Sequence, residues 1–335
     1  MRDVRIAALA GETARECLDD ATLARQLGVP VEDVSSRSRA LIRSSAPDGE
    51  GPAMLSARVA RRVLESAGVG ANEVDMIVFA TTTPDITFPG SACLLQAELA
   101  AHTGSACLDV RSQCTGFLTA LDVARRFVAC GTYARVLVAA ADVPTHVLRY
   151  DGHDTDLAVL AGDGAAVALV EPGDGAGRVL SCVTRIDGHR YRQFWCEFPA
   201  SRHMSGPGIT RGARVSREAF ESGAMYPHVD FPALRETALR ELPAVFDLAL
   251  EDARMERVDA AIVAHVSPAV EDELRAALAP RVGRFLKRRT AYGFGSTLPL
   301  ALADAVGAGE LRSGETVAMA TAGSGASWGA AVVRW

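Results

Sequence analysis

Features that point to several classes of protein are missing from this chain of 335 residues. The cysteines number seven, which is odd, and none forms a Cys-x-x-Cys pair. This argues against a disulfide framework and against a zinc site, and is typical of a protein of the reducing cytoplasm. The chain also has no basic surplus, since its net charge is −6 and its pI is about 5.7. We therefore expect a cytoplasmic protein that binds no metal and no nucleic acid.

Long apolar runs are missing as well. No uninterrupted run reaches the roughly 18 apolar residues that a membrane helix needs. The apolar stretch after Met1–Arg5 is only a few residues long, which predicts no secretory signal. Hydrophobic residues make up 49% and charged residues 23% of the chain, as in ordinary globular proteins. We expect a protein without a membrane segment, large enough for one large or two medium domains.

What the chain does contain is an alternation of apolar strand-like runs and amphipathic helical stretches. Strands are predicted at 5–10, 74–81, 106–110, 135–141, 258–265, 316–321 and 330–335, and helices at 20–27, 52–67, 91–101, 116–130, 231–252, 270–278 and 298–306. The segment 33–48 is predicted to be a polar loop, and 323–329 a glycine loop. The irregular segment 187–230 is interpreted as an excursion that shapes a substrate pocket. The alternation predicts an α/β fold.

A weak internal repeat suggests that the α/β core is duplicated. The apolar strand Val74–Thr81 can be aligned with Val258–His265. Each is followed by a strand, a helix and a turn that opens a second helix, at Cys114 in the first half and at Gly293–Thr297 in the second. Because strand ends of an α/β sheet commonly carry the site, we expect it where two halves, residues 1–172 and 173–335, meet.

Cys114 is the predicted nucleophile. It follows Ala106–Val110, which is predicted to be a short buried strand, and it stands just before a helix that begins at Gly116. The free N–H groups and the dipole of a helix N-terminus favour an anion, so they are expected to lower the pKa of the thiol and supply a thiolate. The alternative is a small apolar residue packed in a turn.

Four segments, taken together, resemble the β-ketoacyl-ACP synthase III family. They occur in that family's order and span nearly the whole chain: Thr83–Pro89, Asp109–Phe117, Gly162–Ala165 and Gly323–Ala330. The resemblance implies the thiolase fold, a duplicated five-layered α-β-α-β-α arrangement, and a homodimer. It also implies ping-pong acyl transfer through a cysteine thioester. The acyl group would arrive on an acyl carrier protein (ACP) or on coenzyme A, and no separate cofactor is expected.

The resemblance assigns roles to individual residues. Cys114 matches the family's nucleophile, and His265 its catalytic histidine. Ser324 lies in the loop whose backbone N–H, with that of Cys114, forms the oxyanion hole. Phe88 matches the aromatic residue that reaches across the dimer into the partner's acyl pocket. Without the resemblance, His265 and Phe88 would be interpreted as core residues.

Two positions depart from the family pattern. Tyr292 holds the place of the family's asparagine, and it is either a wall of the substrate pocket or a functional hydroxyl. Asp33 holds the place of the tryptophan that stacks on the adenine of coenzyme A, which makes an ACP the more natural donor. Arg37 matches a nearby arginine and is predicted to contact the donor or its carrier protein, unless it is simply solvated.

These departures decide the functional hypothesis. In condensing members, histidine and asparagine stabilise the enolate that forms when malonyl-thioester loses CO2. Thioester exchange needs only the cysteine, an oxyanion hole and one base. The leading hypothesis is therefore an acyltransferase of natural-product biosynthesis, which passes the acyl group from Cys114 to a small alcohol or amine acceptor. The alternative is a decarboxylative condensing enzyme that primes polyketide or fatty-acid chains, and a third possibility is a non-catalytic partner subunit.

Overall fold

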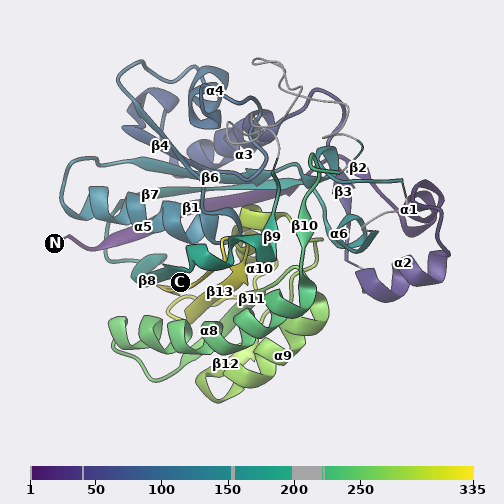
Figure 1. Cartoon of the computed structure of the whole chain (residues 1–335). Helices are drawn as coiled ribbons and strands as arrows, with labels where there is room; N and C mark the ends of the chain where they lie inside the picture. Colours follow the sequence, from purple (N-terminus) through teal and green to yellow (C-terminus); the bar gives the residue numbers. More distant parts are fainter. Residues whose placement is uncertain (1, 40, 152–154, 198–220, 222) are drawn as a thin grey trace.

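The centre of the molecule is a ten-stranded sheet (Figure 1). The computed structural model describes residues 2–39, 41–151, 155–197, 221 and 223–335. Along the sheet the strands follow the order β12-β11-β13-β14-β8-β1-β7-β6-β4-β5. Their bounds are β1 (Val4–Thr13), β4 (Met76–Ala80), β5 (Ala106–Val110), β6 (Val136–Asp142), β7 (Gly164–Pro172), β8 (Arg178–Ile186), β11 (Val258–Ala264), β12 (Val282–Phe285), β13 (Thr316–Gly323) and β14 (Ser327–Arg334).

The sheet contains one pattern twice. β4 runs parallel to β5 and β6, and β7 pairs antiparallel to β6. In the same way, β11 runs parallel to β12 and β13, and β14 pairs antiparallel to β13. β1 extends the first set beside β7, and β8 extends the second set beside β14. The two sets form one sheet because β1 and β8 meet at the pair Arg5↔Arg178. The predicted repeat is confirmed, since its two segments form β4 and β11. We propose that the halves divide between Pro172, the end of β7, and Arg178, the start of β8.

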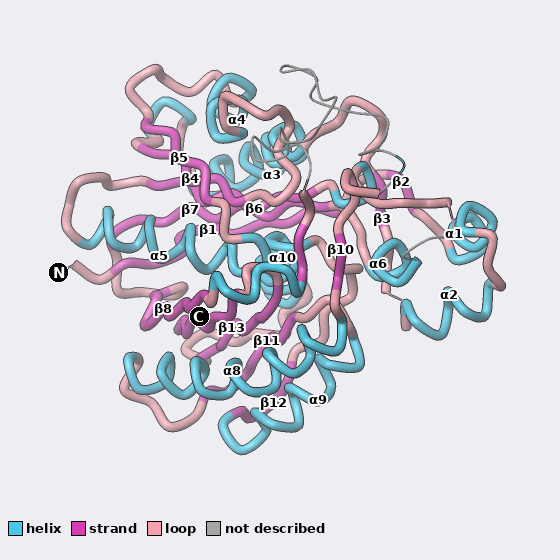
Figure 2. The backbone as a smooth tube through the Cα atoms, viewed as in Figure 1, coloured by secondary structure: helices cyan, strands magenta, loops and turns pink. Residues whose placement is uncertain are grey.

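The helices complete five layers. α3 and α4 share one apolar core with β4, β6 and β7, and α8 and α9 share another with β11, β13 and β14. Between the two strand sets, α5 and α10 are buried in a core to which both sets contribute. Figure 2 shows these two central helices with strands on either side. The predicted five-layered α-β-α-β-α fold is therefore confirmed.

The bounds of the helices follow from local sequence signals. They are α1 (Asp20–Leu27), α2 (Val31–Ser38), α3 (Pro52–Ala67), α4 (Ser91–Glu98), α5 (Gly116–Ala129), α6 (Thr155–Leu160), α8 (Phe231–Asp252), α9 (Pro268–Leu278) and α10 (Thr297–Gly307). α3, for example, has Pro52 in its first turn and ends at Gly68, whose φ of 65° suits glycine. Within the described residues, none of the helices is both long and apolar enough to cross a membrane.

The structure differs from the sequence-based expectations in three places. The predicted loop 33–48 begins as helix α2, because Val34 is buried in an apolar cluster with residues of α1. The predicted glycine loop 323–329 is shorter, because β13 continues to Gly323 and β14 already begins at Ser327. The strand at 106–110, predicted to be buried, is half-exposed β5 at the edge of the sheet.

The described part of the excursion predicted at 187–230 contains little regular structure. It includes a short 3₁₀ helix, η4 (Gly188–Gln193), and the strand pair β9 (Phe194–Trp195) and β10 (His228–Val229). Residues 198–220 and 222, which make up much of the predicted pocket-forming segment, lie outside the described residues. A second short pair, β2 (Glu16–Cys17) with β3 (Ser44–Ser45), lies near α1 (Figure 1).

Candidate active site

Cys114 lies where the sequence predicted, between a strand and a helix. It occupies the 3₁₀ turn η2 (Gln113–Thr115), which follows β5 and leads directly into α5. The other half contains a similar turn, η7 (Phe294–Ser296), which leads into α10. The first residue of each turn has a left-handed backbone, with φ of 43° at Gln113 and 46° at Phe294. The two halves therefore present matching turns, with Cys114 in one and Gly295 at the equivalent place in the other.

The hairpin between β13 and β14 closes over the thiol. The Ser324 N–H donates to Cys114 Sγ at 3.4 Å. A Cβ at Gly323 would lie 2.3 Å from the same sulfur, so only glycine fits beside the thiol. The structure thus brings Cys114 and Ser324 together, and the oxyanion-hole role of their N–H groups stays a prediction.

Burial governs the protonation of Cys114. The side chain is 2% exposed. Burial raises the pKa of the thiol to about 11, although the Tyr292 hydroxyl and the Ser324 N–H act in the opposite direction. The expectation that the helix N-terminus lowers this pKa is therefore wrong for the resting protein. The reason is that Cys114 is inside the apolar core, where an unpaired thiolate loses its hydration.

His265 lies at the adjoining strand end. It follows Ala264, the last residue of β11, and Ala264 pairs with Thr321 of β13. Because β13 ends at Gly323 beside the Cys114 sulfur, this register brings His265 to the end of the sheet where the thiol lies. The two residues come from different halves, as expected for a site where the halves meet.

The imidazole of His265 is neutral, and its protonated nitrogen can be assigned. Its Nδ1 accepts a hydrogen bond from the Ser267 N–H at 3.0 Å. The proton of the neutral ring is therefore on Nε2, which is buried and has no partner among the described residues. Burial, with the charge of Arg288, lowers the pKa of His265 to about 4. At neutral pH this residue is a hydrogen-bond donor through Nε2.

Tyr292 is fully buried between β12 and η7, next to the thiol. Its hydroxyl approaches both Cys114 and Thr321, yet forms no well-aligned hydrogen bond with a described group. Burial raises the pKa of the phenol well above its usual value, so the hydroxyl keeps its proton. Of the two interpretations of Tyr292, the position of the hydroxyl favours the functional one.

Asp142 is a site residue that the sequence analysis missed. It ends β6, is fully buried, and accepts hydrogen bonds from the N–H groups of Thr82 at 2.6 Å and Gly295 at 3.0 Å. It thereby fastens the η7 turn of one half to the strand ends of the other. Burial raises the pKa of its carboxyl group to about 7. The signal in the sequence was an aspartate at the end of an otherwise apolar strand.

Two other predicted residues lie apart from this group. Phe88 is 73% exposed and so lines no interior pocket of its own chain. Arg37, on α2, is bound to Asp156 and donates to Thr155 Oγ1 at 3.1 Å, so it already has partners on α6. Their predicted contacts with a partner subunit and with the donor both concern molecules outside this chain.

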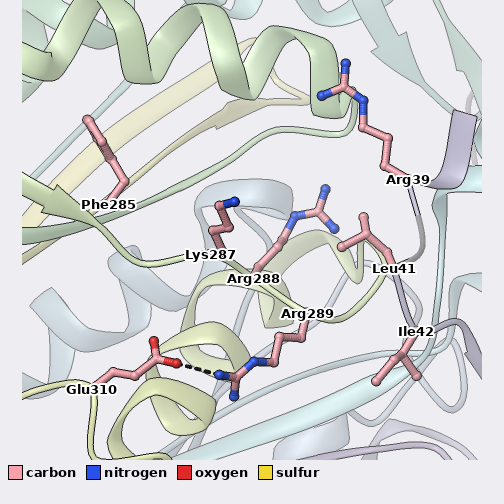
Figure 3. A pocket seen from close by; sticks show the side chains of 8 residues that line it. All are labelled: Arg39, Leu41, Ile42, Phe285, Lys287, Arg288, Arg289 and Glu310. Atoms are coloured by element: carbon pink, nitrogen blue, oxygen red, sulfur yellow. Dashed lines mark hydrogen bonds and ion pairs between the residues drawn. The ribbon is translucent and has the colours of Figure 1, made fainter.

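A pocket of about 630 Å³ lies between the segment that follows α2 and the segment that follows β12 (Figure 3). Its lining contains neither Cys114 nor His265; the lining residues are Arg39, Leu41, Ile42, Phe285, Lys287, Arg288, Arg289 and Glu310. Figure 3 shows Arg289 turned toward Glu310, with which it forms an ion pair. Among the described residues, no group of His, Cys, Asp and Glu side chains is arranged to hold a metal ion.

The comparisons with known proteins agree with this geometry. Residues 108–188 match the 3-oxoacyl-[acyl-carrier-protein] synthase III family, and residues 248–335 match the C-terminal part of that family. β-Ketoacyl-[acyl-carrier-protein] synthase III of Xylella fastidiosa (strain Temecula1) is 31% identical over 99% of this chain and 98% of its own length. The protein of that name from Roseiflexus castenholzii is 30% identical over 95% of this chain and 94% of its own length.

Solved structures extend the likeness to the whole fold. The crystal structure of 3-oxoacyl-(acyl carrier protein) synthase III from Pseudomonas aeruginosa PAO1 superposes with a TM-score of 0.85. That likeness covers 100% of this chain and 98% of the other, at 25% sequence identity. With a buried cysteine, a histidine and a glycine hairpin assembled at the meeting point of two matching halves, the chain belongs to the 3-oxoacyl-[acyl-carrier-protein] synthase III family.

Proposed function

We propose that this chain is a condensing enzyme, which loads an acyl group onto Cys114 and joins it to a malonyl thioester with loss of CO2. One observation carries the proposal. His265 presents a proton on Nε2, because Nδ1 is occupied by the Ser267 N–H. A donor in that place suits the stabilisation of an enolate oxygen, which decarboxylation requires. The names of the curated relatives point in the same direction.

The first half-reaction is thioester exchange. The sulfur of Cys114 attacks the carbonyl carbon of an acyl-ACP or acyl-CoA, and the departing carrier thiol takes up the proton that Cys114 releases. The tetrahedral oxyanion accepts hydrogen bonds from the N–H groups of Cys114 and Ser324. Ser324 is suited to this role because its N–H already points at the Cys114 sulfur. To contribute to donor binding, Arg37 would have to replace its contacts with Asp156 and Thr155 of α6 by contacts with the donor.

The second half-reaction forms the carbon–carbon bond. Malonyl-thioester loses CO2, and the resulting enolate attacks the acyl carbon on Cys114, which releases the sulfur as leaving group. We assign the stabilisation of the enolate oxygen to His265 Nε2–H and the Tyr292 hydroxyl. Both are buried donors that form no well-aligned hydrogen bond with a described group. Tyr292 would thus take over the task of the asparagine in related condensing enzymes.

Acyl transfer to an alcohol or amine is the second candidate, and the replacement of that asparagine by Tyr292 favours it. Such a transfer needs a base that removes a proton from the acceptor. For His265 to accept that proton on Nε2, the ring proton would have to move to Nδ1. The Ser267 N–H would then lose its acceptor. This cost is the reason that we rank acyl transfer second.

The decisive experiment follows the acyl-enzyme after malonyl-ACP is added. We expect release of CO2 and a β-ketoacyl product, both dependent on prior loading of Cys114. Tyr292→Phe should slow CO2 release by about 10²-fold, because one donor to the enolate is lost, while loading of Cys114 is retained. Mass spectrometry of protein and product measures both steps.

A matched control and a contrary outcome complete this test. The control is Tyr133→Phe. Tyr133 follows α5 and packs against Phe127 of that helix, so loss of its hydroxyl should leave both steps unchanged. A stable acyl-enzyme that releases no CO2, but is discharged by an added alcohol or amine, would replace condensation with acyl transfer. Unchanged CO2 release in Tyr292→Phe would make Tyr292 a pocket wall.

We further propose that two copies of the chain form a homodimer through the edge strand β5. Among the described strands, β5 pairs with β4 alone, and such open edges are usually covered. Large apolar side chains are exposed on β5, where Leu108 is 38% exposed, and on the loop before α4, where Ile86 is 45% and Phe88 73% exposed. The start of α4 is tied to β5, since the Ala92 N–H donates to Asp109. Sedimentation velocity should detect a dimer, and Leu108→Arg should shift it to monomer. A wild-type monomer at micromolar concentration would contradict this proposal.

A further inference from the structure

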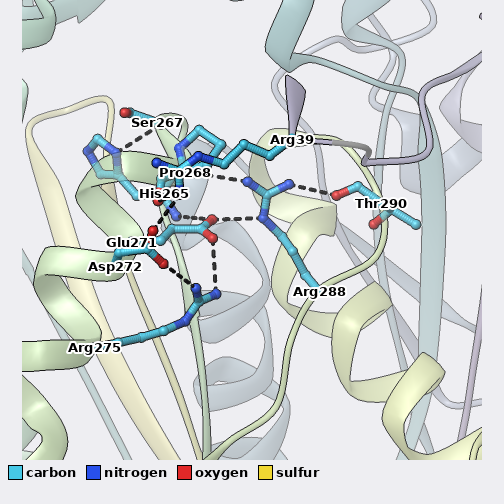
Figure 4. Close-up of polar contacts among 9 residues, drawn as sticks. All are labelled: Arg39, His265, Ser267, Pro268, Glu271, Asp272, Arg275, Arg288 and Thr290. Atoms are coloured by element: carbon cyan, nitrogen blue, oxygen red, sulfur yellow. Dashed lines mark hydrogen bonds and ion pairs between the residues drawn. The ribbon is translucent and has the colours of Figure 1, made fainter. Parts of the chain in front are cut away.

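A buried ion pair joins Arg288 and Glu271 beside the backbone of His265 (Figure 4). Arg288 Nε and Glu271 Oε1 are 2.7 Å apart, and their side chains are 1% and 4% exposed. Arg288 is in the loop between β12 and η7, four residues before Tyr292, whereas Glu271 is in the first turn of α9, six residues after His265. The pair therefore connects the two segments that carry the donors.

Glu271 supports the His265 side of this connection. Its Oε1, which is bound to Arg288, also accepts the backbone N–H of His265 at 3.0 Å. Its other oxygen accepts from Arg275 Nη2 at 3.1 Å. Figure 4 shows the carboxylate between these groups, with the imidazole of His265 turned away from it toward Ser267. Glu271 thus holds the backbone of His265 and leaves the ring free.

Arg288 supports the Tyr292 side. Its Nη1 donates to the carbonyl of Thr290 at 2.6 Å, and its Nη2 lies 3.5 Å from the carbonyl of His265. The guanidinium is also 6.0 Å from the centroid of the Tyr292 ring, within reach of a cation–π contact. A planar fork of donors can hold these groups at fixed relative angles, which a lysine ammonium cannot.

We propose that Arg288 and Glu271 are positioning residues, which set the distance and angle between His265 Nε2 and the Tyr292 hydroxyl. The inference rests on the proposed function, because it assumes that these two groups act on one substrate oxygen. Stability alone does not account for the pair, since a buried ion pair is often no better than apolar residues of similar volume. Two donors that must meet one oxygen do need fixed geometry, and small displacements slow such reactions strongly.

The test compares three variants with a matched control. Arg288→Met breaks the connection but leaves Glu271 without its buried partner. The double variant Arg288→Met/Glu271→Leu removes both charges and so avoids an unpaired buried carboxylate. Arg288→Lys keeps the charge without the fork. The control is Arg289→Met, at the neighbouring exposed arginine that is paired with Glu310. Melting temperature, loading of Cys114, and kcat and KM for malonyl-ACP are measured for each.

We expect the double variant to melt near the wild type and to load Cys114 at nearly the wild-type rate. Its kcat for CO2 release should fall about 10- to 100-fold with an unchanged KM, because the donors are misplaced while binding persists. Arg288→Lys should lose less kcat than the double variant but should stay below the wild type, and Arg289→Met should match the wild type. A folded double variant with wild-type kcat would overturn the proposal, as would equal losses in loading and in CO2 release.

A second readout separates this proposal from the proposed function. The NMR signal of the His265 ring, assigned through its loss in His265→Ala, should shift in the double variant and stay in place in Arg289→Met. If the wild type releases no CO2, the proposed function fails, yet this signal still tests whether the pair positions the ring. An unmoved signal in the folded double variant would refute the positioning role.

Discussion

Cys114→Ala is expected to abolish both acyl loading and product formation. The acyl group is bound through the sulfur in the proposed mechanism, and the cluster of described residues around Cys114 contains no second thiol. Intact mass after incubation with an acyl thioester measures loading, with peptide mapping to locate the adduct. The matched control is Cys182→Ala, because Cys182 is also buried but donates to the Leu118 carbonyl at 3.1 Å in the core. An adduct that survives in Cys114→Ala would refute the proposed nucleophile.

The pH dependence of Cys114 tests which influence sets its reactivity. With the pKa of the thiol raised to about 11, the thiolate is a small fraction at neutral pH. As long as the pH is below this pKa, the thiolate fraction increases tenfold for each unit by which the pH rises. Alkylation of Cys114 by iodoacetamide should therefore accelerate about 100-fold between about pH 7 and 9. A rate that is flat over this range would mean that the helix N-terminus outweighs burial.

His265→Ala is expected to lower the rate of CO2 release by about 10³-fold, because one of the two proposed donors to the enolate is lost together with the ring that fills its place. Loading of Cys114 should continue, since thioester exchange uses the backbone N–H groups of the oxyanion hole. Stopped assays of CO2 release and of the acyl-enzyme separate the two effects. His102→Ala is a suitable control, because this histidine is exposed and its ring accepts a hydrogen bond from the nearby Gly104 N–H.

The wild-type rate should also report the unusual state of His265. Because burial holds the pKa of the ring at about 4, the ring stays neutral, and His265 should contribute no inflection near pH 6.5 to the rate of CO2 release. Loss of rate through His265 is expected only as the pH decreases through about 4, where a proton on Nδ1 would displace the Ser267 N–H. An inflection near 6.5 that also appears in the NMR signal of the His265 ring, and is therefore distinct from titration of Asp142, would indicate an imidazole exposed to water and would favour the role of a base.

Local sequence signals predicted a large part of this architecture. Apolar periodicity placed α8 at its observed bounds, because a 22-residue amphipathic helix repeats its pattern over several turns. The strand-to-helix turn at Cys114 was predictable for a similar reason, since an apolar strand precedes it and a run of residues with helical periodicity follows it. The family resemblance then predicted roles for His265 and Ser324, which are far from Cys114 in the chain. These inferences depend on residues that are neighbours in sequence or on segments that occur in the family's order.

Contacts between distant residues could not be inferred in this way. The pKa of Cys114 depends on how completely the two halves cover it, and the sequence-based argument considered only the helix that follows. The roles of Asp142, Glu271 and Arg288 depend on partners in other segments, such as Gly295 and His265. A buried charged residue has no local pattern of its own, so its partner cannot be read from spacing.

The sequence by itself determined the duplicated α/β plan and the family, and it predicted Cys114 as the nucleophile, because each of these inferences rests on short segments with local physical causes. Only the tertiary structure decided that Cys114 is a protonated thiol, that His265 offers a donor at Nε2, and that Tyr292 brings its hydroxyl to the sulfur. The reason is that protonation and hydrogen-bond direction depend on burial and on partners from both halves, which come together only when the chain folds.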